Sequence, residues 1–342
     1  MKKISDFKIY NEFDEHLMKE WQKLWNLLKG NYNLSPEWCS IWFKYFGNKN
    51  KKLFIYTAWE NDELKLVAPF YLKDKVLYLI GSKPDFHDEF DILSTSSQYT
   101  QKLVEDILDK ELKVDFRLVN SENDFIKYFL REIENNKNFS KKIYYSTLKL
   151  QANSSFEFKK SFCQLIKKRT KRSINEHNQK LSFEYETSKD SDFFEEMLFL
   201  HKKRWPLFKS KEKELFIKDI YYNTDLLLLS RLSDENTGNS ISFQLSYKYF
   251  DRLLASTLVF NPAFKTISPS LILFYNFINE GFKRNYSVID LGVGAMRYKY
   301  DLSNSQSIIL SLETDSSILR KNDFIYSTLK GLKATFVSLF IQ

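Results

Sequence analysis

Residues that crosslink or interrupt a chain are scarce in this sequence. Its 342 residues include two cysteines, six prolines and eight glycines. The two cysteines, Cys39 and Cys163, are too few and too far apart for a disulfide framework or a cysteine metal site. A reduced cytosol is therefore the expected setting. The low proline and glycine content, without any low-complexity tract, argues against long disordered linkers.

Long apolar runs are also missing. A membrane-spanning helix needs roughly 20 consecutive apolar residues, whereas the apolar stretches at 226–229 and 267–278 are short or broken by polar residues. The N-terminal segment MKKISDFKIYNE starts with basic residues, as secretory signals do, but places polar residues where the apolar stretch belongs. We therefore expect a soluble, cytoplasmic protein with no integral membrane segment.

The chain is long enough, and at 43% hydrophobic rich enough, to bury two cores. Segments with helical and strand-like spacing alternate in each half, which predicts an α/β fold of two domains. We expect the first domain at 1–152 and the second at 153–316. A helical tail at 317–342 could pack on the first domain.

Positive charge exceeds negative charge by eight, with a pI near 9.0. In a mixed-charge chain this balance mainly favours solubility. One local cluster is stronger, because eight basic residues between 159 and 180 are opposed only by Glu176. As a helix, this segment presents either a solvated face or a surface for phosphate-bearing ligands, such as a nucleotide-linked substrate, a transfer RNA end or anionic lipid. The cluster comprises Lys159, Lys160, Lys167, Lys168, Arg169, Lys171, Arg172 and Lys180.

The most informative stretch is 241–302, which predicts strand, turn, strand, Asn-Pro turn, helix and strand. Ser268, Pro269 and Ser270 predict the start of that helix, with Ser268 as the cap and Pro269 in the first position. A helix start leaves backbone N–H groups without partners and carries partial positive charge. Together with Lys265, it predicts a site for the phosphate or carboxylate of a cofactor.

Several single residues are candidates for chemistry, each with a plainer alternative. Asp290 ends a strand just before Gly292, where either a functional carboxylate or a turn-forming one is common. Tyr298 and Lys299 are either substrate contacts or part of a domain interface. Gln244 could orient an acceptor, or simply belong to one face of a sheet. His201 lies on an apolar helical stripe, which favours a histidine at the edge of the core over a catalytic one.

An acidic loop in the first half contains Asp85, His87 and Asp88. Its mixed hydrogen-bonding groups suit a sugar or amine acceptor, although an ordinary polar loop has the same composition. Without a further ligand, this group does not predict a metal site.

The motifs occur in an order that resembles a known superfamily. In the first half they are Ser35-Pro36-Glu37-Trp38, Val67-Ala68-Pro69-Phe70 and Asp85-Phe86-His87-Asp88; in the second they are the basic segment 167–172, the segment 200–205, Phe243-Gln244-Leu245, Asn261-Pro262-Ala263-Phe264, Ser268-Pro269-Ser270 and the segment 290–299. The chain resembles GNAT-superfamily acyltransferases of the CelD (cellulose biosynthesis) type, whose architecture is similar to that of the FemABX aminoacyltransferases.

This resemblance implies two GNAT-like domains, each a mixed, largely antiparallel sheet flanked by helices. It implies acyl transfer from acetyl-CoA or another acyl-CoA to an amine or hydroxyl of a small or sugar-linked acceptor, in envelope polysaccharide synthesis and without a metal. Cofactor contacts are expected at Leu258, Val259, Phe260, Lys265, Ser268 and Ser270. Catalysis is expected at Asp290, Tyr298 and Lys299, and acceptor binding at Asp85, His87, Asp88, Gln244 and Arg297.

The sequence departs from the family pattern in two places. The loop before the helix at 268 has no glycine, and Val293, Ala295 and Met296 stand where relatives carry an arginine and then an acidic pair. Two alternatives therefore stay open. One is a FemABX-like transferase that uses aminoacyl-tRNA, and the other is a catalytically silent GNAT-fold binding or scaffold protein. Simple nucleic-acid binding is a third possibility, for which affinity would fall steeply with salt.

Overall fold

The computed structural model describes residues 7–48, 50–82, 89–134, 139–151, 180–205, 207–293 and 297–314, with backbone alone at 139–146, 207, 297, 298 and 301. These residues fall into two units. Among these described residues, unit 1 comprises those at 7–147, Val293 and 307–314, and unit 2 comprises those at 148–292 and 297–306. The basic segment 167–172, the loop with Asp85, His87 and Asp88, and the tail at 317–342 lie outside the described residues.

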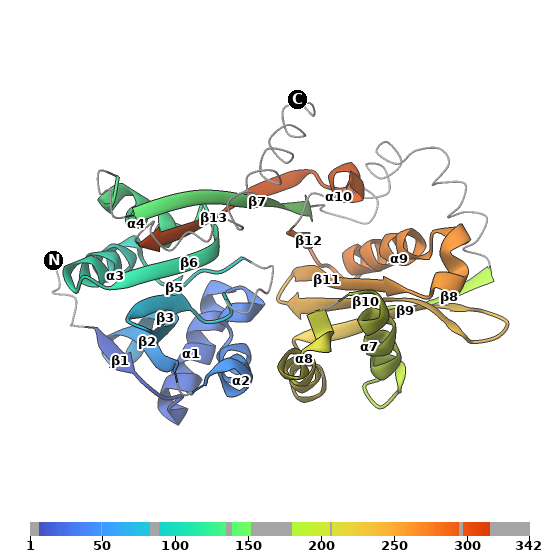
Figure 1. The fold of residues 1–342 in the computed structure, drawn as a ribbon, viewed down its shortest axis with the longest axis horizontal. Coiled ribbons are helices and arrows are strands. Elements are labelled where there is room, and N and C mark those ends of the chain that lie inside the picture. The colour runs from blue at the N-terminus through green and yellow to red at the C-terminus, as the bar shows by residue number, and fades with distance from the viewer. Residues whose placement is uncertain are drawn as a thin grey trace. The chain divides into compact units, whose positions relative to one another are not determined.

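Unit 1 is a mixed sheet between helices. Its strands run in the order β1-β2-β3-β4-β6-β13, with β5 beside β3, and all described pairs are antiparallel except β4 with β6. Helices α1 and α2 cover one face, and α3 and α4 the other (Figure 1). The elements are β1 Lys8–Tyr10, α1 Glu15–Leu28, η1 Tyr32–Leu34, α2 Pro36–Phe46, β2 Lys52–Glu60, β3 Glu63–Lys73, β4 Val76–Leu79, β5 Leu93–Ser94, α3 Ser97–Asp109, β6 Lys113–Asn120, α4 Asp124–Glu132, β7 Phe139–Gln151 and β13 Ser305–Thr314.

Unit 2 repeats this plan. Its strands run in the order β12-β11-β10-β9-β8, and only the β11–β12 pair is parallel. Helix α9 covers one face of the sheet, and α7 and α8 cover the other (Figure 1). The elements are β8 Leu181–Glu184, α7 Phe193–Arg204, η3 Leu207–Lys209, α8 Lys211–Asn223, β9 Leu227–Asp234, β10 Ser240–Tyr249, β11 Arg252–Phe260, η4 Pro262–Ile267, α9 Pro269–Lys283, β12 Val288–Val293 and α10 Arg297–Leu302.

The mixed α/β fold expected from the sequence is confirmed. Local signals placed many boundaries well. Helix α2 begins after Ser35, whose hydroxyl accepts a hydrogen bond from the Trp38 amide at 3.2 Å, and it ends at Gly47. The β2–β3 hairpin turns through Asn61 and Asp62, both at positive φ. Helix α8 and strand β13 were not among the expected elements.

The limits of the two units differ from the expected domain limits. The chain passes into unit 2 after Thr147, and residues 307–314 of β13 belong to unit 1, whereas the sequence assigned 153–316 to the second domain. The physical reason is that β13 pairs with β6, with Ile309 opposite Asn120 and Leu312 opposite Phe116. Such a long-range pairing leaves no local signature in the sequence.

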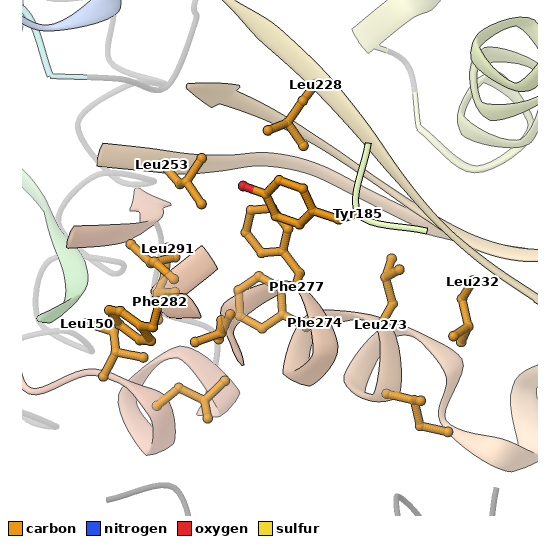
Figure 2. Packing of buried hydrophobic residues seen from close by; sticks show 14 of the residues in the cluster. Leu150, Tyr185, Leu228, Leu232, Leu253, Leu273, Phe274, Phe277, Phe282 and Leu291 are labelled. Carbon is orange, nitrogen blue, oxygen red and sulfur yellow. The ribbon is translucent and has the colours of Figure 1, made fainter. Parts of the chain in front are cut away.

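The core between α9 and the sheet of unit 2 fixes the position of that helix. Phe277 of α9 stacks on Tyr185, with ring centroids 5.9 Å apart, and Leu273 and Phe274 are buried in the same cluster (Figure 2). At Gly281 the helix comes so close to the sheet that an added Cβ would lie 3.0 Å from Leu253 and 3.2 Å from Ile289. Gly281 therefore allows α9 to approach the strands β11 and β12 closely.

Candidate functional site

Strands β11 and β12 run side by side only at their beginnings. The recorded partners are Arg252 with Val288, Leu253 with Ile289 and Leu254 with Asp290. Strand β11 continues to Phe260 and β12 to Val293, but no further pairing between them is found among the described residues. The rest of β11 therefore has an edge that β12 does not cover, although β10 pairs with its other side.

A β-bulge lies at the point where the two strands part. Thr257 pairs with Leu245 and Ala255 pairs with Ser246, so Ser256 is an extra residue in β11. A bulge bends its strand and changes the direction of the residues that follow. Here it separates the part of β11 that pairs with β12 from the part that does not.

The backbone of β11 after the bulge offers donors at its uncovered edge. The Asn261 amide donates to the Ile241 carbonyl on β10 at 2.8 Å. Because backbone groups alternate sides along an antiparallel strand, Val259 also points its amide towards β10, and Leu258 and Phe260 point theirs away from it. Of the three residues expected to contact the thioester, Leu258 and Phe260 therefore present amides at the open edge, and Val259 does not.

Helix α9 begins directly after η4, with Pro269 in its first position as expected. Ser268 occupies the cap position, but its φ of 56° is left-handed and its hydroxyl makes no capping hydrogen bond. Its carbonyl instead accepts from the amides of Leu271 at 3.0 Å and Ile272 at 3.3 Å. Among the described residues, this leaves the Ser270 amide as the one donor of the first turn without an acceptor. The Lys265 side chain is exposed before it.

Asp290 and Lys299 meet around one glycine. The Gly292 amide donates to the Asp290 carboxylate at 2.7 Å, and the Lys299 ammonium donates to the Gly292 carbonyl at 3.2 Å. Gly292 has a φ of 73°, a left-handed conformation that suits glycine. Lys149, which no sequence motif singles out, places its Nζ 3.9 Å from the buried Asp290 carboxylate. The structure thus gathers two of the three expected catalytic side chains at the end of β12.

Tyr298 and Arg297 belong to α10, immediately before Lys299, but their side chains lie outside the described residues. The same holds for Asp85, His87 and Asp88. Glu89, which follows that loop, accepts hydrogen bonds from Thr147 Oγ1 at 2.7 Å and from Asn120 Nδ2 at 3.3 Å. Burial raises the pKa of the nearby Asp91 carboxyl to about 7, and the Glu89 charge adds to that shift.

Gln244 is 1% exposed on β10, directly opposite Leu258. Its Nε2 donates to the Leu245 carbonyl at 2.8 Å, and its Oε1 has no hydrogen-bond partner among the described residues. A buried amide oxygen without a donor is costly. Gln244 lies one strand away from the open edge, and its Oε1 can still accept a hydrogen bond. It therefore stays a candidate for orienting the molecule that receives the acyl group.

His201 lies within the apolar face of α7, as its helical spacing indicates. It is buried against Phe208, with ring centroids 4.6 Å apart, and burial lowers its pKa to about 4. A histidine that is neutral and enclosed at pH 7 fits the core interpretation better than a catalytic one.

The end of α7 carries a group that the sequence analysis did not select. The Arg204 guanidinium lies over two rings, at 5.3 Å from the Trp205 centroid and 4.8 Å from that of Phe260. The basic and aromatic residues at 199–205 can be seen in the sequence. Their contact with Phe260 at the end of β11 cannot, because it joins segments that are far apart in the chain.

Neither a metal cluster nor a membrane span is evident in the part of the chain that the structure describes. It contains no group of three His, Cys, Asp or Glu side chains arranged to hold a metal ion. None of its helices is both long and apolar enough to cross a bilayer.

Comparison with known families identifies the region that contains this geometry. Residues 166–300 match the family described as "Acetyltransferase (GNAT) domain". The match includes β11, α9, β12 and Lys299, and it supports a transferase. Among curated proteins, no sequence matches the chain.

Similar folds occur among solved structures. FemX aligns with a TM-score of 0.63 at 9% identity, covering 91% of this chain and 97% of FemX. L-PGS from Bacillus licheniformis aligns with a TM-score of 0.56 at 11% identity, covering 95% and 99%. A tandem GNAT protein from the clavulanic acid biosynthesis pathway aligns with a TM-score of 0.50 at 8% identity, covering 90% and 98%. At these identities the likeness concerns the fold alone.

Proposed function

We propose that this chain, which carries a GNAT-type acetyltransferase domain, transfers an acyl group from coenzyme A to an amine or hydroxyl. The acceptor would be a small or sugar-linked molecule, and envelope polysaccharide synthesis is the setting that the resemblance to CelD-type proteins suggests. Unit 2 would hold the donor.

The observation that carries this proposal is the parting of β11 from β12 at the Ser256 bulge. It leaves the amides of Leu258 and Phe260 at an uncovered strand edge. An extended acyl-bearing arm can pair with such an edge as a further strand would. In acyl transfer, the acceptor attacks the thioester carbonyl, whose oxygen becomes negatively charged before the carbon–sulfur bond breaks. A fixed backbone amide within hydrogen-bond reach of that oxygen stabilises the charge.

The residues present fit coenzyme A in part. The open edge suits its amide-containing arm, and the Ser270 amide with Lys265 offers one dipole and one full charge for its diphosphate. The segment 261–270 contains no glycine, so its backbone has less freedom to approach phosphate than a glycine-rich loop. We therefore expect the acyl-bearing arm to contribute more to binding than the diphosphate.

We assign different roles to Asp290 and Lys299. With one oxygen bonded to the Gly292 amide, Asp290 is placed to fix the backbone at the end of β12. Lys299 holds the other side of the same glycine, and its ammonium is only partly buried. In the proposed site Lys299 contacts the donor or the acceptor, and Tyr298 is a candidate proton carrier. Asp290 keeps Lys299 and Tyr298 in place.

Calorimetric titration with acetyl-CoA tests the donor. We expect heat on binding, and slow release of free thiol when a mixture of amino sugars is added. Desulfo-coenzyme A serves as a control that binds without reacting. A protein that shows neither heat nor a thermal shift with acetyl-CoA, while desulfo-coenzyme A is equally inert, would contradict the coenzyme A proposal.

Aminoacyl-tRNA is the second candidate donor. It is favoured by the helix start at α9, which offers a single free amide and no glycine for a diphosphate, and by the resemblance to FemABX proteins. This alternative predicts that aminoacyl-tRNA, but not acetyl-CoA, supports transfer to an amine. Parallel assays with radiolabelled acetyl-CoA and a mixture of radiolabelled aminoacyl-tRNAs separate the two donors.

A further inference from the structure

We propose that the end of α7 is a stacking site for the base of a phosphorylated nucleotide. The site consists of Arg204 at the end of α7, Trp205 directly after the helix, Phe260 at the end of β11, and the pair Phe199 and Lys203 on α7. The identity of the ligand rests on the proposed function, because both candidate donors contain a phosphorylated adenosine. Coenzyme A carries adenosine with phosphates on its 3′ and 5′ oxygens, and transfer RNA ends in adenosine.

The first observation is the density of cation–ring pairs. Lys203 Nζ lies 3.9 Å from the Phe199 ring centroid, and Arg204 lies over both Trp205 and Phe260. These three pairs join residues near one helix end and one strand end. A planar guanidinium held over rings presents a flat surface on which a base can stack.

The second observation is that these rings remain in water. Phe199 is 57% exposed and Trp205 is 47% exposed, and both are among the few large apolar side chains in the described part of unit 2 that are exposed. Exposed aromatic rings beside cations bind single nucleotides through the face of the base, without reading its sequence. A single exposed ring would need no explanation, whereas Trp205 and Phe260 lie at the same guanidinium and Phe199 is exposed on the same helix.

The third observation is uncompensated charge. Two carboxylates of the α7–α8 layer pair with other lysines, Glu214 with Lys202 at 2.7 Å and Glu195 with Lys218 at 2.9 Å. Neither Lys203 nor Arg204 has a carboxylate partner within the described ranges. Two cations without a carboxylate partner, next to exposed rings, complement a ligand that combines a base with phosphates. They do not favour a neutral ligand in the same way.

The location connects this platform with the donor strand. Phe260 belongs to both, because its amide faces the open edge of β11 while its ring contacts Arg204. The chain then continues through η4 to Lys265 and Ser270. A nucleotide stacked at Arg204 would therefore have its phosphates near the start of α9 and could extend its reactive arm along β11.

Binding measurements on the full chain test the proposal. The probes are adenosine 3′,5′-bisphosphate, which is the nucleotide part of coenzyme A, and a short single-stranded RNA ending in CCA. We expect Trp205→Ala and Arg204→Ala each to weaken the probe that binds by about tenfold or more, since one stacked base contributes roughly 1–3 kcal/mol. Binding should also weaken as salt increases.

Two variants serve as matched controls. Tyr222→Ala removes another exposed aromatic ring of the same unit, on α8, and Arg131→Ala removes another arginine over an aromatic ring, here Tyr128, but one that pairs with Glu132. Both should bind the probes as the unaltered protein does. Circular dichroism verifies that all four variants are folded, which is expected because the altered side chains are exposed.

Each result either supports or contradicts the stacking site. If Trp205→Ala and Arg204→Ala bind both probes unchanged, or if no probe binds the unaltered protein, the stacking site is wrong. If the variants instead alter sedimentation, the platform is an interface between copies of the chain, and the proposal is again wrong. If acetyl-CoA binds all variants equally, the proposed function stands and only this inference fails. If the RNA alone binds and the two variants weaken it, the inference stands, and titration with intact acetyl-CoA decides whether the proposed donor fails.

Discussion

The buried histidine of α7 contributes to the pH dependence of the molecule's stability. Burial lowers the pKa of His201 to about 4, below the value of about 6.5 for an unfolded chain. Because the folded pKa is the lower one, the stabilisation is complete above about pH 6.5 and is lost as the pH falls towards 4. Over that interval the neutral histidine accounts for up to about 3 kcal/mol.

We therefore expect His201→Leu to flatten the decline of unfolding free energy between pH 6.5 and 4, measured by urea denaturation. His16→Gln alters an exposed histidine on α1 and should leave the decline unchanged. If His201→Leu and the unaltered protein lose stability in parallel, the histidine is accessible to protons in the folded state.

Substitution of Gly292 tests whether the end of β12 belongs to the site. A φ of 73° costs an alanine roughly 1–2 kcal/mol, while the added Cβ would meet Ala255 O at 3.6 Å and Lys299 Nζ at 3.7 Å, which are ordinary contacts. Gly238 has a φ of 70° and nothing within 4 Å of an added Cβ. Gly292→Ala and Gly238→Ala should therefore lose similar stability in thermal unfolding.

Only Gly292→Ala should reduce transfer, because its peptide groups hold Asp290 and Lys299. We expect a loss of at least tenfold in kcat/KM for the thioester assay, with Gly238→Ala close to the unaltered enzyme. Equal activity of the two variants would remove the Asp290–Lys299 turn from the site.

At the scale of elements, the alternation of amides along β11 leads us to expect opposite effects of proline at two adjacent residues. Leu258 points its amide to the open edge, and Val259 points its amide to β10. Replacement by proline removes the amide hydrogen in both cases. Leu258→Pro should fold with a small loss in melting temperature and lower kcat about 10²–10³-fold, the usual effect of removing an oxyanion donor.

Val259→Pro removes a hydrogen bond within the sheet and should therefore lower the free energy of unfolding more than Leu258→Pro does. Chemical denaturation and the thioester assay, performed on both variants, distinguish the two effects. A folded and fully active Leu258→Pro protein would show that its amide has no part in the reaction.

The same strand shows what sequence reasoning could reach. Local patterns located β10, β11, α9 and β12, because each has its own periodicity and turn residues. The bulge at Ser256 and the early parting of β11 from β12 depend on register between strands, which one segment does not encode. Helix α8 had a readable pattern in buried Phe216, Ile217, Ile220 and Tyr221, but its many charged residues obscured it. Lys149 and Arg204 joined their sites through contacts between distant segments.

At the scale of the whole molecule, the chain enters unit 2 and then returns, so that unit 1 depends on the C-terminal strand β13. Leu310 and Leu312 of β13 are buried, and Leu312 lies opposite Phe116 of β6. The last described strand therefore stabilises the first unit. This connection accounts for the difference between the observed units and the division of the sequence at residue 152.

The dependence predicts which half of the molecule a C-terminal substitution affects. Leu312→Ala should cost about 2–5 kcal/mol through lost burial and the cavity left behind. Because Leu312 contacts β6, hydrogen exchange should accelerate at the amides of β6 while those of α9 stay protected. Leu273→Ala, at a buried position of α9, should give the reverse pattern. If both variants accelerate exchange equally in both units, the units unfold as one cooperative body rather than separately.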